Sequence, residues 1–278
     1  MMNSDKRHFL VVASASRGAR FFVKNALRQG HDVTALCRAQ DDAAALRRMT
    51  DLLKQTELTP GGQPAADRPG QLTARNLSIL DPETYGQLLR ANASIDAICC
   101  FVGVTKIKDM RNPECSLYSD TISAIAAGMQ QSRNVEVYYH GSVGTEGVPG
   151  TSKTKWPAHA SIFTNLTQRI FPIFYDVTRS ENILANAAAE AGFEFVIFRP
   201  AALRNAPAKR KYGASFDTTG LDKADLPLRM AHKTISREDA AEEILRVSTL
   251  PDTERRQWYG HGVYLVDMKD TYWKARRT

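Results

Sequence analysis

Short apolar runs alternate with longer segments of helical periodicity along the chain. The short runs are rich in β-branched and aromatic residues and predict strands. Those strands are expected at residues 9–12, 32–37, 77–80, 95–102, 135–139, 193–198 and 263–266. The run 95–102 is apolar at almost every position, which is typical of a strand that is covered on both faces.

Segments with apolar residues every three or four positions lie between these strands and predict helices. They are expected at residues 21–27, 41–56, 116–129 and 158–191, with further helix starts at 81 and 236. Asp81-Pro82 places a proline at the first helical position, and Gly30 suits the left-handed end of a helix. Pro172 predicts a break, and Ser236 followed by Asp239 resembles a capping box.

Strands that alternate with helices predict an α/β fold, a Rossmann-like doubly wound parallel sheet with right-handed crossovers. Residues 59–70 hold several prolines and glycines and predict a loop. Residues 200–235 break the alternation, so we expect an inserted substrate-side lobe there, over the carboxyl edge of the sheet. The sequence shows no internal repeat, and residues 1–278 are expected to form a single domain.

The composition, 43% hydrophobic and 24% charged, lies in the globular range and excludes a disordered or fibrous protein. The formal net charge is +7, and the sequence pI is about 9.3. Residues 255–278 carry six basic side chains against Asp267 and Asp270, so four of these charges belong to the C-terminal segment. A basic excess of this size permits an anionic ligand, and we do not expect a nucleic-acid partner.

The sequence also bounds the compartment. No apolar stretch approaches the roughly 20 residues of a membrane-spanning helix, and the polar residues 1–7 leave no room for the apolar core of a signal peptide. Cys37, Cys99, Cys100 and Cys115 lack metal-ligand spacing, and adjacent Cys99 and Cys100 would point to opposite faces of a strand. We therefore expect buried reduced thiols, no metal site, no membrane association and a cytoplasmic protein.

The first strand-to-helix turn is the expected ligand site, because ligands of such sheets bind outside the carboxyl ends of the strands. The turn reads Ala13-Ser-Ala-Ser-Arg-Gly-Ala-Arg20. Backbone N–H groups at a helix N-terminus would face a pyrophosphate there, and glycine permits the close approach. Gly18 is the only glycine in the turn.

This turn resembles that of the short-chain dehydrogenase/reductase superfamily in two registers. Ala15-Ser-Arg-Gly18 is similar to the middle of the TGASRGIG turn of standard members, with Ser14 and Arg20 in place of two glycines. Counting back from Gly30-His-Asp-Val33 fits the GATGxxG turn of atypical members, whose glycine positions become Ala13, Ser16 and Ala19. The substituted residues of this second register are small, so a backbone approach to the ligand remains open.

The resemblance extends over residues 8–250. Residues 96–103 resemble the fourth strand of atypical members, and 135–142 resemble the fifth, which ends in the active-site serine. Residues 193–200 are similar to the sixth strand with its Arg-Pro ending, and 235–241 to a late helix start. The chain thus resembles the atypical NAD(P)-binding group that contains isoflavone-reductase-like, NmrA-like and biliverdin-reductase-B-like proteins. The resemblance implies cofactor-binding roles for Ala13, Ser14, Ser16, Arg17, Gly18, Ala19, Arg38, Ser78, Gly103 and Pro200.

The second strand indicates which dinucleotide would bind. NAD enzymes place an acid near the end of this strand to hold the ribose hydroxyls. Here the strand ends in Leu36-Cys37-Arg38, without an acid, and arginine suits a 2′-phosphate. Arg17 and Arg38 together therefore favour NADP as the cofactor. The alternative is that both are solvated arginines.

The resemblance also implies catalytic roles for Ser142, Tyr175 and Arg179. In standard members a serine polarises the substrate carbonyl, a tyrosine transfers the proton, and a lysine four residues later lowers the pKa of the tyrosine. Tyr175 and Arg179 have that spacing, but a guanidinium cannot relay a proton. The alternative is that Tyr175, which follows Phe171 and Phe174, is a core residue and that Ser142 belongs to a turn.

Other polar residues are expected to have ordinary roles. His31, His140 and His232 are isolated in the sequence and are expected to be surface or core histidines. Arg204 and the basic run 209–211 could reach an acidic substrate or the cofactor phosphates, or could form a solvated loop.

The sequence therefore predicts an NADP(H)-dependent oxidoreductase that transfers hydride to a small carbonyl or conjugated substrate. The alternative is a degenerate NADP-binding protein that acts as a redox sensor or as a non-catalytic subunit of a larger complex. The expected partner is a small-molecule substrate, and the sequence is compatible with an oligomer.

Overall fold

The centre of the protein is one mostly parallel β-sheet, seen in a computed structural model that describes residues 6–104, 106–130, 135–142, 169–215 and 234–267. The strand order is β3-β2-β1-β4-β5-β6-β10-β8, and β8 alone pairs antiparallel, with β10. A separate two-stranded sheet pairs β7 with β9. The strands are β1 His8–Val12, β2 Asp32–Leu36, β3 Leu72–Arg75, β4 Ala97–Cys100, β5 Glu136–His140, β6 Phe195–Pro200, β7 Ala202–Arg204, β8 Tyr212–Ser215, β9 Thr234–Ser236 and β10 His261–Asp267.

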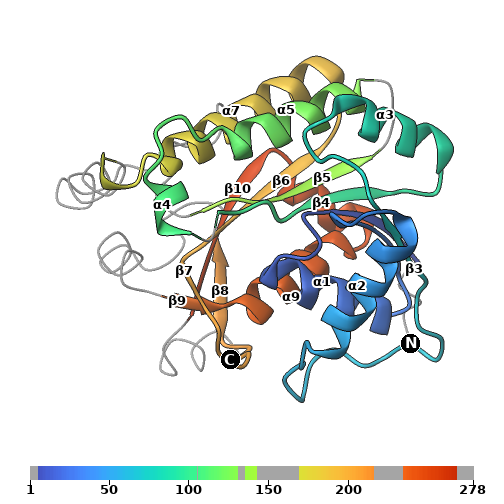
Figure 1. The fold of residues 1–278 in the computed structure, drawn as a ribbon. Coiled ribbons are helices and arrows are strands. Elements are labelled where there is room, and N and C mark those ends of the chain that lie inside the picture. The colour runs from blue at the N-terminus through green and yellow to red at the C-terminus, as the bar shows by residue number, and fades with distance from the viewer. Residues whose placement is uncertain (1–5, 105, 131–134, 143–168, 216–233, 268–278) are drawn as a thin grey trace.

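Helices cover both faces of the sheet (Figure 1). One layer holds α1 Arg17–Arg28, α2 Asp42–Lys54 and α9 Arg237–Ser248, and the other holds α3 Pro82–Ala91, α5 Leu117–Met129 and α7 Ile173–Ala191. Shorter helices are α4 Ile107–Met110, α10 Asp252–Arg255 and the 3₁₀ turn η1 Arg256–Trp258. The predicted doubly wound, Rossmann-like fold is confirmed.

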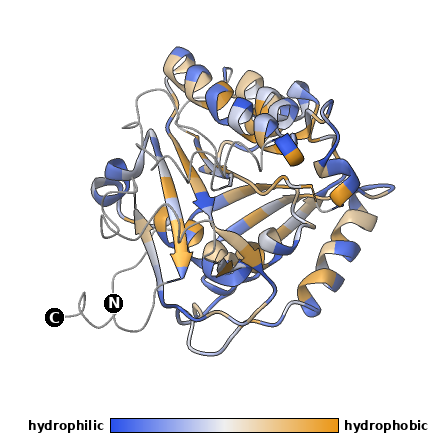
Figure 2. Ribbon diagram, turned by 90° about the vertical axis from the view of Figure 1, so that its left-hand side faces the viewer, coloured by the Kyte–Doolittle hydropathy of each residue, from blue (hydrophilic) through white to orange (hydrophobic). Residues whose placement is uncertain are grey.

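The alternation of side chains along each strand produces two cores. Phe9 and Val11 of β1 belong to the core beneath α1 and α9, whereas Leu10 and Val12 belong to the core beneath α3, α5 and α7. Figure 2 shows hydrophobic residues along the strands, and helices in which hydrophobic and hydrophilic residues alternate. Cys99 and Cys100 lie in opposite cores, as their adjacency predicts.

All four cysteines are free. Cys37, Cys99 and Cys100 are buried, and Cys115 is partly exposed. Burial raises the pKa of the Cys100 thiol to about 12, so that this thiol stays protonated and packs as a small apolar group.

The third strand is the one element that the sequence pattern misplaced. A strand was expected at residues 77–80, but β3 is Leu72–Arg75, which pairs in parallel with β2 from Leu72 opposite Val33. Residues 77–80 form the turn before α3, where Ile79 accepts a hydrogen bond from the Tyr85 hydroxyl and Leu80 is 47% exposed. An apolar run of four residues does not by itself distinguish a strand from a covering turn.

The helix boundaries follow their capping signals. Asp81 caps α3 with proline at the first position, and the Ser236 hydroxyl accepts a hydrogen bond from the Asp239 amide at the start of α9. Gly30 has a φ of +90° just after α1. The predicted break at Pro172 is confirmed because α7 begins directly after it, whereas residues 158–168 of the predicted helix lie outside the described residues.

The segment 200–235 departs from the strand–helix alternation as expected. Strands β7 and β9 form the small second sheet at its two ends, and β8 joins the edge of the main sheet. Residues 216–233 lie outside the described residues, and a substrate-side lobe stays a prediction.

Candidate functional site

The crevice expected to bind a ligand lies where the chain changes direction across the sheet. From β1 the strand order runs one way through β2 to β3 and the other way through β4 to β5. At this point the turn after β1 and the turn after β4 meet at the carboxyl edge of the sheet. Open α/β sheets bind their ligands in such a crevice.

Ala13, at the start of the turn after β1, has a backbone conformation that is typical of glycine. Ala13 has a φ of 56°, in the left-handed region that L residues rarely adopt. The Ser16 amide donates a hydrogen bond to the Ala13 carbonyl at 2.9 Å, which closes the turn. Ala13 is the first glycine position in the atypical register, so the chain accepts strain where a glycine would have none.

The two serines of this turn have structural partners. The buried Ser14 hydroxyl donates to the Leu36 carbonyl at 2.7 Å, and the Ser14 amide donates to the same carbonyl at 3.2 Å. Ser16 is the N-cap of α1, and its hydroxyl accepts a hydrogen bond from the Ala19 amide at 3.3 Å. Ser14 therefore ties the turn to β2 and Ser16 starts the helix, while contacts of either with a cofactor stay predictions.

Gly18 rests on an aromatic layer that the sequence did not single out. A Cβ atom at Gly18 would lie 3.6 Å from Cδ1 of Phe101, which is an ordinary contact. The buried Phe101 ring, just beyond β4, has its centroid 5.4 Å from that of Phe22 and 5.5 Å from that of His140. The first turn of α1 thus lies against Phe101, and the position that a Cβ atom of Gly18 would take faces this ring.

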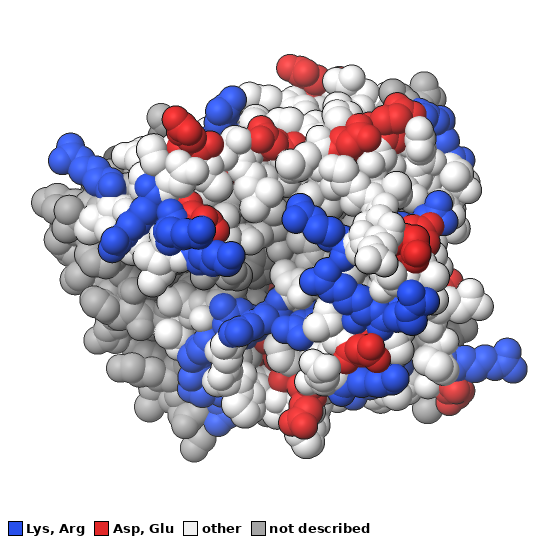
Figure 3. Space-filling model, viewed as in Figure 1, with Lys and Arg blue, Asp and Glu red and all other residues white. Residues whose placement is uncertain are grey.

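At the starts of α1 and α9, the positive charge of Arg17 lies close enough to Arg20 and Arg237 to affect the pKa of both. Burial lowers the pKa of Arg20 and of Arg237, and the positive charge of Arg17 lowers both further. Arg17 is exposed in the first turn of α1. Figure 3 shows basic side chains gathered in the lower middle of this face, where Figure 1 draws α1 and α9. The start of α1 is therefore electropositive through its side chains as well as its N–H groups.

Arg38 lies apart from this group. It is exposed just beyond the end of β2, and its carbonyl accepts a hydrogen bond from the Arg48 guanidinium. Its convergence with Arg17 on a 2′-phosphate stays a prediction.

His140 belongs to the crevice although it is isolated in the sequence. It ends β5 beside Phe101, and burial, together with the smaller effect of the Arg237 charge, lowers its pKa to about 4. Its ring is therefore neutral near pH 7. Ser142 follows two residues later, after Gly141, whose amide donates to the Phe198 carbonyl at 2.8 Å. His140 and Arg237 are distant in sequence, so no local pattern could have paired them.

Tyr175 and Arg179 share the exposed side of α7. Tyr175 is 54% exposed and Arg179 is also exposed, so the interpretation of Tyr175 as a core residue is wrong. The opposite side is anchored, because the buried Asp176 carboxylate accepts from the Tyr118 amide at 2.8 Å and from the Ser119 amide at 3.2 Å. Residues 143–168 between Ser142 and α7 lie outside the described residues, and the grouping of the catalytic residues stays a prediction.

The remaining cofactor candidates follow other strands. Ser78 is exposed in the turn before α3, and its hydroxyl accepts from the Leu80 amide at 3.3 Å. Gly103 is exposed after β4, next to Val104, whose amide donates to the Tyr118 hydroxyl at 3.3 Å. Pro200 is buried at the end of β6, opposite Leu265 of β10. Their contacts with a cofactor stay predictions.

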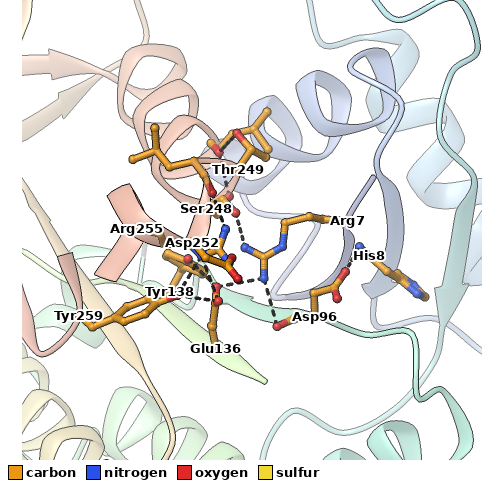
Figure 4. A network of polar contacts seen from close by, with 12 residues as sticks. Arg7, His8, Asp96, Glu136, Tyr138, Ser248, Thr249, Asp252, Arg255 and Tyr259 are labelled. Carbon is orange, nitrogen blue, oxygen red and sulfur yellow. Dashed lines mark hydrogen bonds and ion pairs between the residues drawn. The ribbon is translucent and has the colours of Figure 1, made fainter. Parts of the chain in front are cut away.

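A cavity of about 1380 Å³ opens at the amino edge of the sheet, on the side opposite the crevice. Figure 4 shows the polar network beside it, centred on Glu136. The Glu136 carboxylate lies 3.0 Å from both Arg7 and Arg255 and accepts hydrogen bonds at 2.7 Å from the hydroxyls of Tyr138 and Tyr259. This network joins β1 and β5 to the helices after α9. Its charged groups form ion pairs and hydrogen bonds with one another, which is typical of a network that stabilises the fold.

In the part of the chain that the structure describes, no group of three or more His, Cys, Asp or Glu side chains is placed to hold a metal ion. None of the described helices has the length and apolar character that crossing a membrane requires.

No protein-family model matches the sequence, and no curated protein matches it at a significant level. Solved structures do resemble it. The terminal R domain of the myxalamid PKS-NRPS pathway matches with a TM-score of 0.63 at 13% identity, over 98% of this chain and 70% of that one. A short-chain dehydrogenase/reductase from Veillonella parvula in complex with NADP matches at 0.57 and 15% identity, over 94% of each chain. The anaerobillin reductase ChuY from Escherichia coli O157:H7 matches with a TM-score of 0.57 at 13% identity, over 94% of this chain and 98% of that one.

These likenesses show the fold. The chain is an α/β protein with the Rossmann-like fold that short-chain dehydrogenases/reductases also have, as the sequence resemblance implies. At these identities the chemistry has to be argued from the residues of the crevice.

Proposed function

We propose that this protein is an NADP(H)-dependent reductase of the short-chain dehydrogenase/reductase type. The observation that carries the proposal is the electropositive start of α1, where the exposed Arg17 lies beside the first amides of the helix at the crevice of a Rossmann-like sheet. Helix N-termini at such crevices bind the pyrophosphate of dinucleotides. The structural likeness to a short-chain dehydrogenase/reductase solved with NADP supports the proposal.

The residues of the turn fit a dinucleotide. The left-handed Ala13 bends the chain as a glycine would, and Gly18 adds no side chain between the start of α1 and Phe101. The expected ligands of the diphosphate are the first amides of α1 and the Arg17 guanidinium. Arg38, exposed beyond β2 without an acid beside it in sequence, would hold the 2′-phosphate and so favour NADP over NAD.

The proposed chemistry is the reduction of a small carbonyl or conjugated compound. When bound, the dihydronicotinamide supplies the hydride. Ser142, beyond the end of β5, would polarise the substrate oxygen by donating a hydrogen bond. The Tyr175 hydroxyl would donate the proton, and Arg179, one helical turn later, would favour its anionic form by charge.

The alternative function is a non-catalytic NADP-binding sensor or subunit. Arg179 favours it, because a guanidinium does not release its proton to a neighbouring tyrosine. The exposure of both Tyr175 and Arg179 also favours it, because proton transfer is best supported in a site that excludes water.

Dinucleotide titration tests the shared part of both functions. Purified protein is titrated with NADPH and with NADH, and binding is followed by cofactor fluorescence. We expect tighter binding of NADPH, a loss of that preference in Arg38→Gln, and weaker binding of both in Arg17→Gln. Arg47→Gln, on the exposed side of α2, is the matched control. No binding of either dinucleotide would overturn both functions.

Turnover separates the two functions. A panel of aldehydes, quinones and conjugated ketones is offered with NADPH, and oxidation of the cofactor is recorded. Reduction of any member, with kcat at least tenfold lower in Tyr175→Phe, supports the enzyme. Tight NADPH binding without turnover across the panel favours the sensor.

A further inference from the structure

A second cavity, of about 700 Å³, lies on the outer side of α1. Three segments surround it: the first half of α1, the loop 55–60 after α2, and the loop 204–207 before β8. Arg17 is the only residue of the expected dinucleotide site that also lines this cavity. The cavity is therefore a neighbour of the crevice with its own walls.

Hydrogen bonds hold the walls of this cavity together. The Glu238 carboxylate at the start of α9 accepts from the Thr59 amide at 2.7 Å and from the Thr59 hydroxyl at 2.6 Å. The Thr59 hydroxyl in turn accepts from the Ala208 amide at 2.9 Å. Arg210 lies 3.6 Å from Glu238 and donates to the Thr59 carbonyl at 2.7 Å. Both loops are thus fixed to α9, and Glu238 shares the Arg210 guanidinium with Glu242, which lies 3.0 Å from it.

Arg20 faces this cavity without a protein partner. Within the described residues its guanidinium makes no hydrogen bond or ion pair, and its Nε atom is buried without an acceptor. The charge acting on Arg20 is that of Arg17, a second cation in the same wall. A buried donor that lacks an acceptor is unfavourable, so an anion bound here would stabilise this arrangement.

The other lining groups define the rest of the ligand. Arg204 is paired with Asp267, and Glu57 is exposed on the loop. Apolar lining comes from Phe21, Leu58, Pro60, Ala206 and Pro207. A volume of 700 Å³ is that of a small-molecule site with apolar walls and a few polar groups.

We propose that this cavity binds a small molecule that carries a phosphate monoester on an aromatic or aliphatic body, with Arg20 and Arg17 as the ligands of the phosphate. A phosphate dianion balances two guanidinium charges and accepts several of their N–H groups. The apolar body would pack against Phe21 and Leu58. Such a ligand binds beside the dinucleotide, with the Arg17 guanidinium between the two anions.

Calorimetric titration with phenyl phosphate tests the site, with inorganic phosphate and phenol as part-ligand probes. We expect phenyl phosphate to bind more tightly than either probe, because it uses both the cations and the apolar wall. Arg20→Gln is expected to weaken it at least tenfold, whereas Arg47→Gln, on α2 outside the cavity, leaves it unchanged. Equal affinity in Arg20→Gln and wild type overturns the proposal.

A second variant protects the test against misfolding of the first. Leu58→Glu adds a negative charge to the loop wall without touching α1, and we expect it to weaken phenyl phosphate by a similar factor. Unchanged affinity in this variant also counts against the proposal. Thermal unfolding of each variant verifies that it is folded.

Titration in the presence of saturating NADPH separates this cavity from the crevice. Persistent binding of phenyl phosphate supports a separate site, and its loss shows that phenyl phosphate occupies the dinucleotide site, which overturns the proposal. If the protein binds no dinucleotide, the proposed function fails while the titrations of Arg20→Gln and Leu58→Glu still decide this site.

Discussion

The Glu181 carboxylate on α7 and the Arg199 guanidinium on β6 form an ion pair with 2.6 Å between Oε2 and Nη2, and both side chains are almost fully buried. Arg199 also donates from Nε to Oε1, at 3.3 Å, so the contact is bidentate. The pair fastens α7, which carries Tyr175 and Arg179, to the sheet at the end of β6. This buried charge pair thus helps to orient the candidate catalytic helix, together with the Asp176 contacts to α5.

Removing one member of this pair is expected to destabilise the fold strongly. Glu181→Gln leaves the Arg199 guanidinium buried without a counter-charge, which costs about 3–5 kcal/mol in the free energy of unfolding. Urea unfolding measures the change. Glu83→Gln is the control, because Glu83 pairs with Arg90 at the surface, where such pairs contribute about 0–1 kcal/mol. Equal losses in the two variants would contradict this role.

The same pair restricts the replacement of a glycine on β10. A Cβ atom at Gly262 on β10 would lie 2.4 Å from Nη1 of Arg199, whose guanidinium is held by Glu181 and cannot move aside freely. Gly262→Ala is expected to lose about 1–3 kcal/mol of stability, as overpacked cores do. At Gly103 the nearest atom would be 3.7 Å away, so Gly103→Ala should change stability by less than about 0.5 kcal/mol. Chemical unfolding of both variants gives the comparison.

The turn after β1 predicts opposite effects of two small substitutions on dinucleotide binding. Ala13→Gly relieves a left-handed alanine, a conformation that costs an L residue about 1–2 kcal/mol, and should leave stability equal or higher and NADPH affinity higher. Gly18→Ala meets only an ordinary contact with Phe101, so the fold should be unaffected. Its added methyl group would nevertheless obstruct the diphosphate and weaken NADPH. Fluorescence titration with parallel thermal unfolding measures both effects, and tighter NADPH binding in Gly18→Ala would contradict the proposed placement.

His31 predicts a loss of stability in mild acid. Its Nδ1 accepts a hydrogen bond from the Arg7 amide at 3.2 Å, and burial, followed by the charge of Arg7, lowers its pKa to about 4. The unfolded chain, with a histidine pKa of about 6.5, binds the proton more readily. The stabilising effect of the neutral ring is therefore complete above pH 6.5 and is lost as the pH falls toward 4, by about 2–3 kcal/mol.

The free energy of unfolding of His31→Asn, measured from pH 7 to pH 4, checks this assignment. The asparagine keeps an acceptor near the position of Nδ1 but does not titrate, so its unfolding free energy should depend less on pH than that of wild type. A residual dependence is expected, because His140 also has a pKa lowered to about 4. An unchanged pH profile in the variant would show that His31 is not the titrating group.

Local signals located most of the elements. The caps at Asp81 and Ser236 and the break at Pro172 depend on residues within one helical turn, and they are where the pattern places them. The third strand was misplaced because its position does not depend on local signals. β3 has only four residues, in which apolar Leu72 and Ala74 alternate with exposed Thr73 and Arg75. So short an alternation is a weak signal, and the position of the strand is decided by pairing with β2.

The candidate site was only partly visible in the sequence. The turn of Ala13 and Gly18 was located through its resemblance to the superfamily, but Phe101 beneath it and His140 beside it were not. Their places follow from the carboxyl ends of β4 and β5 lying side by side in the sheet.

The sequence alone determined the strand–helix alternation, the helix caps and thereby the doubly wound fold, because periodicity and capping act between residues close along the chain. Only the tertiary structure decided which charges meet. Arg199 forms an ion pair with Glu181, and the charge of Arg17 lowers the pKa of both Arg20 and Arg237. Electrostatic energy depends on distance in space and on burial, and neither can be read from positions along the chain.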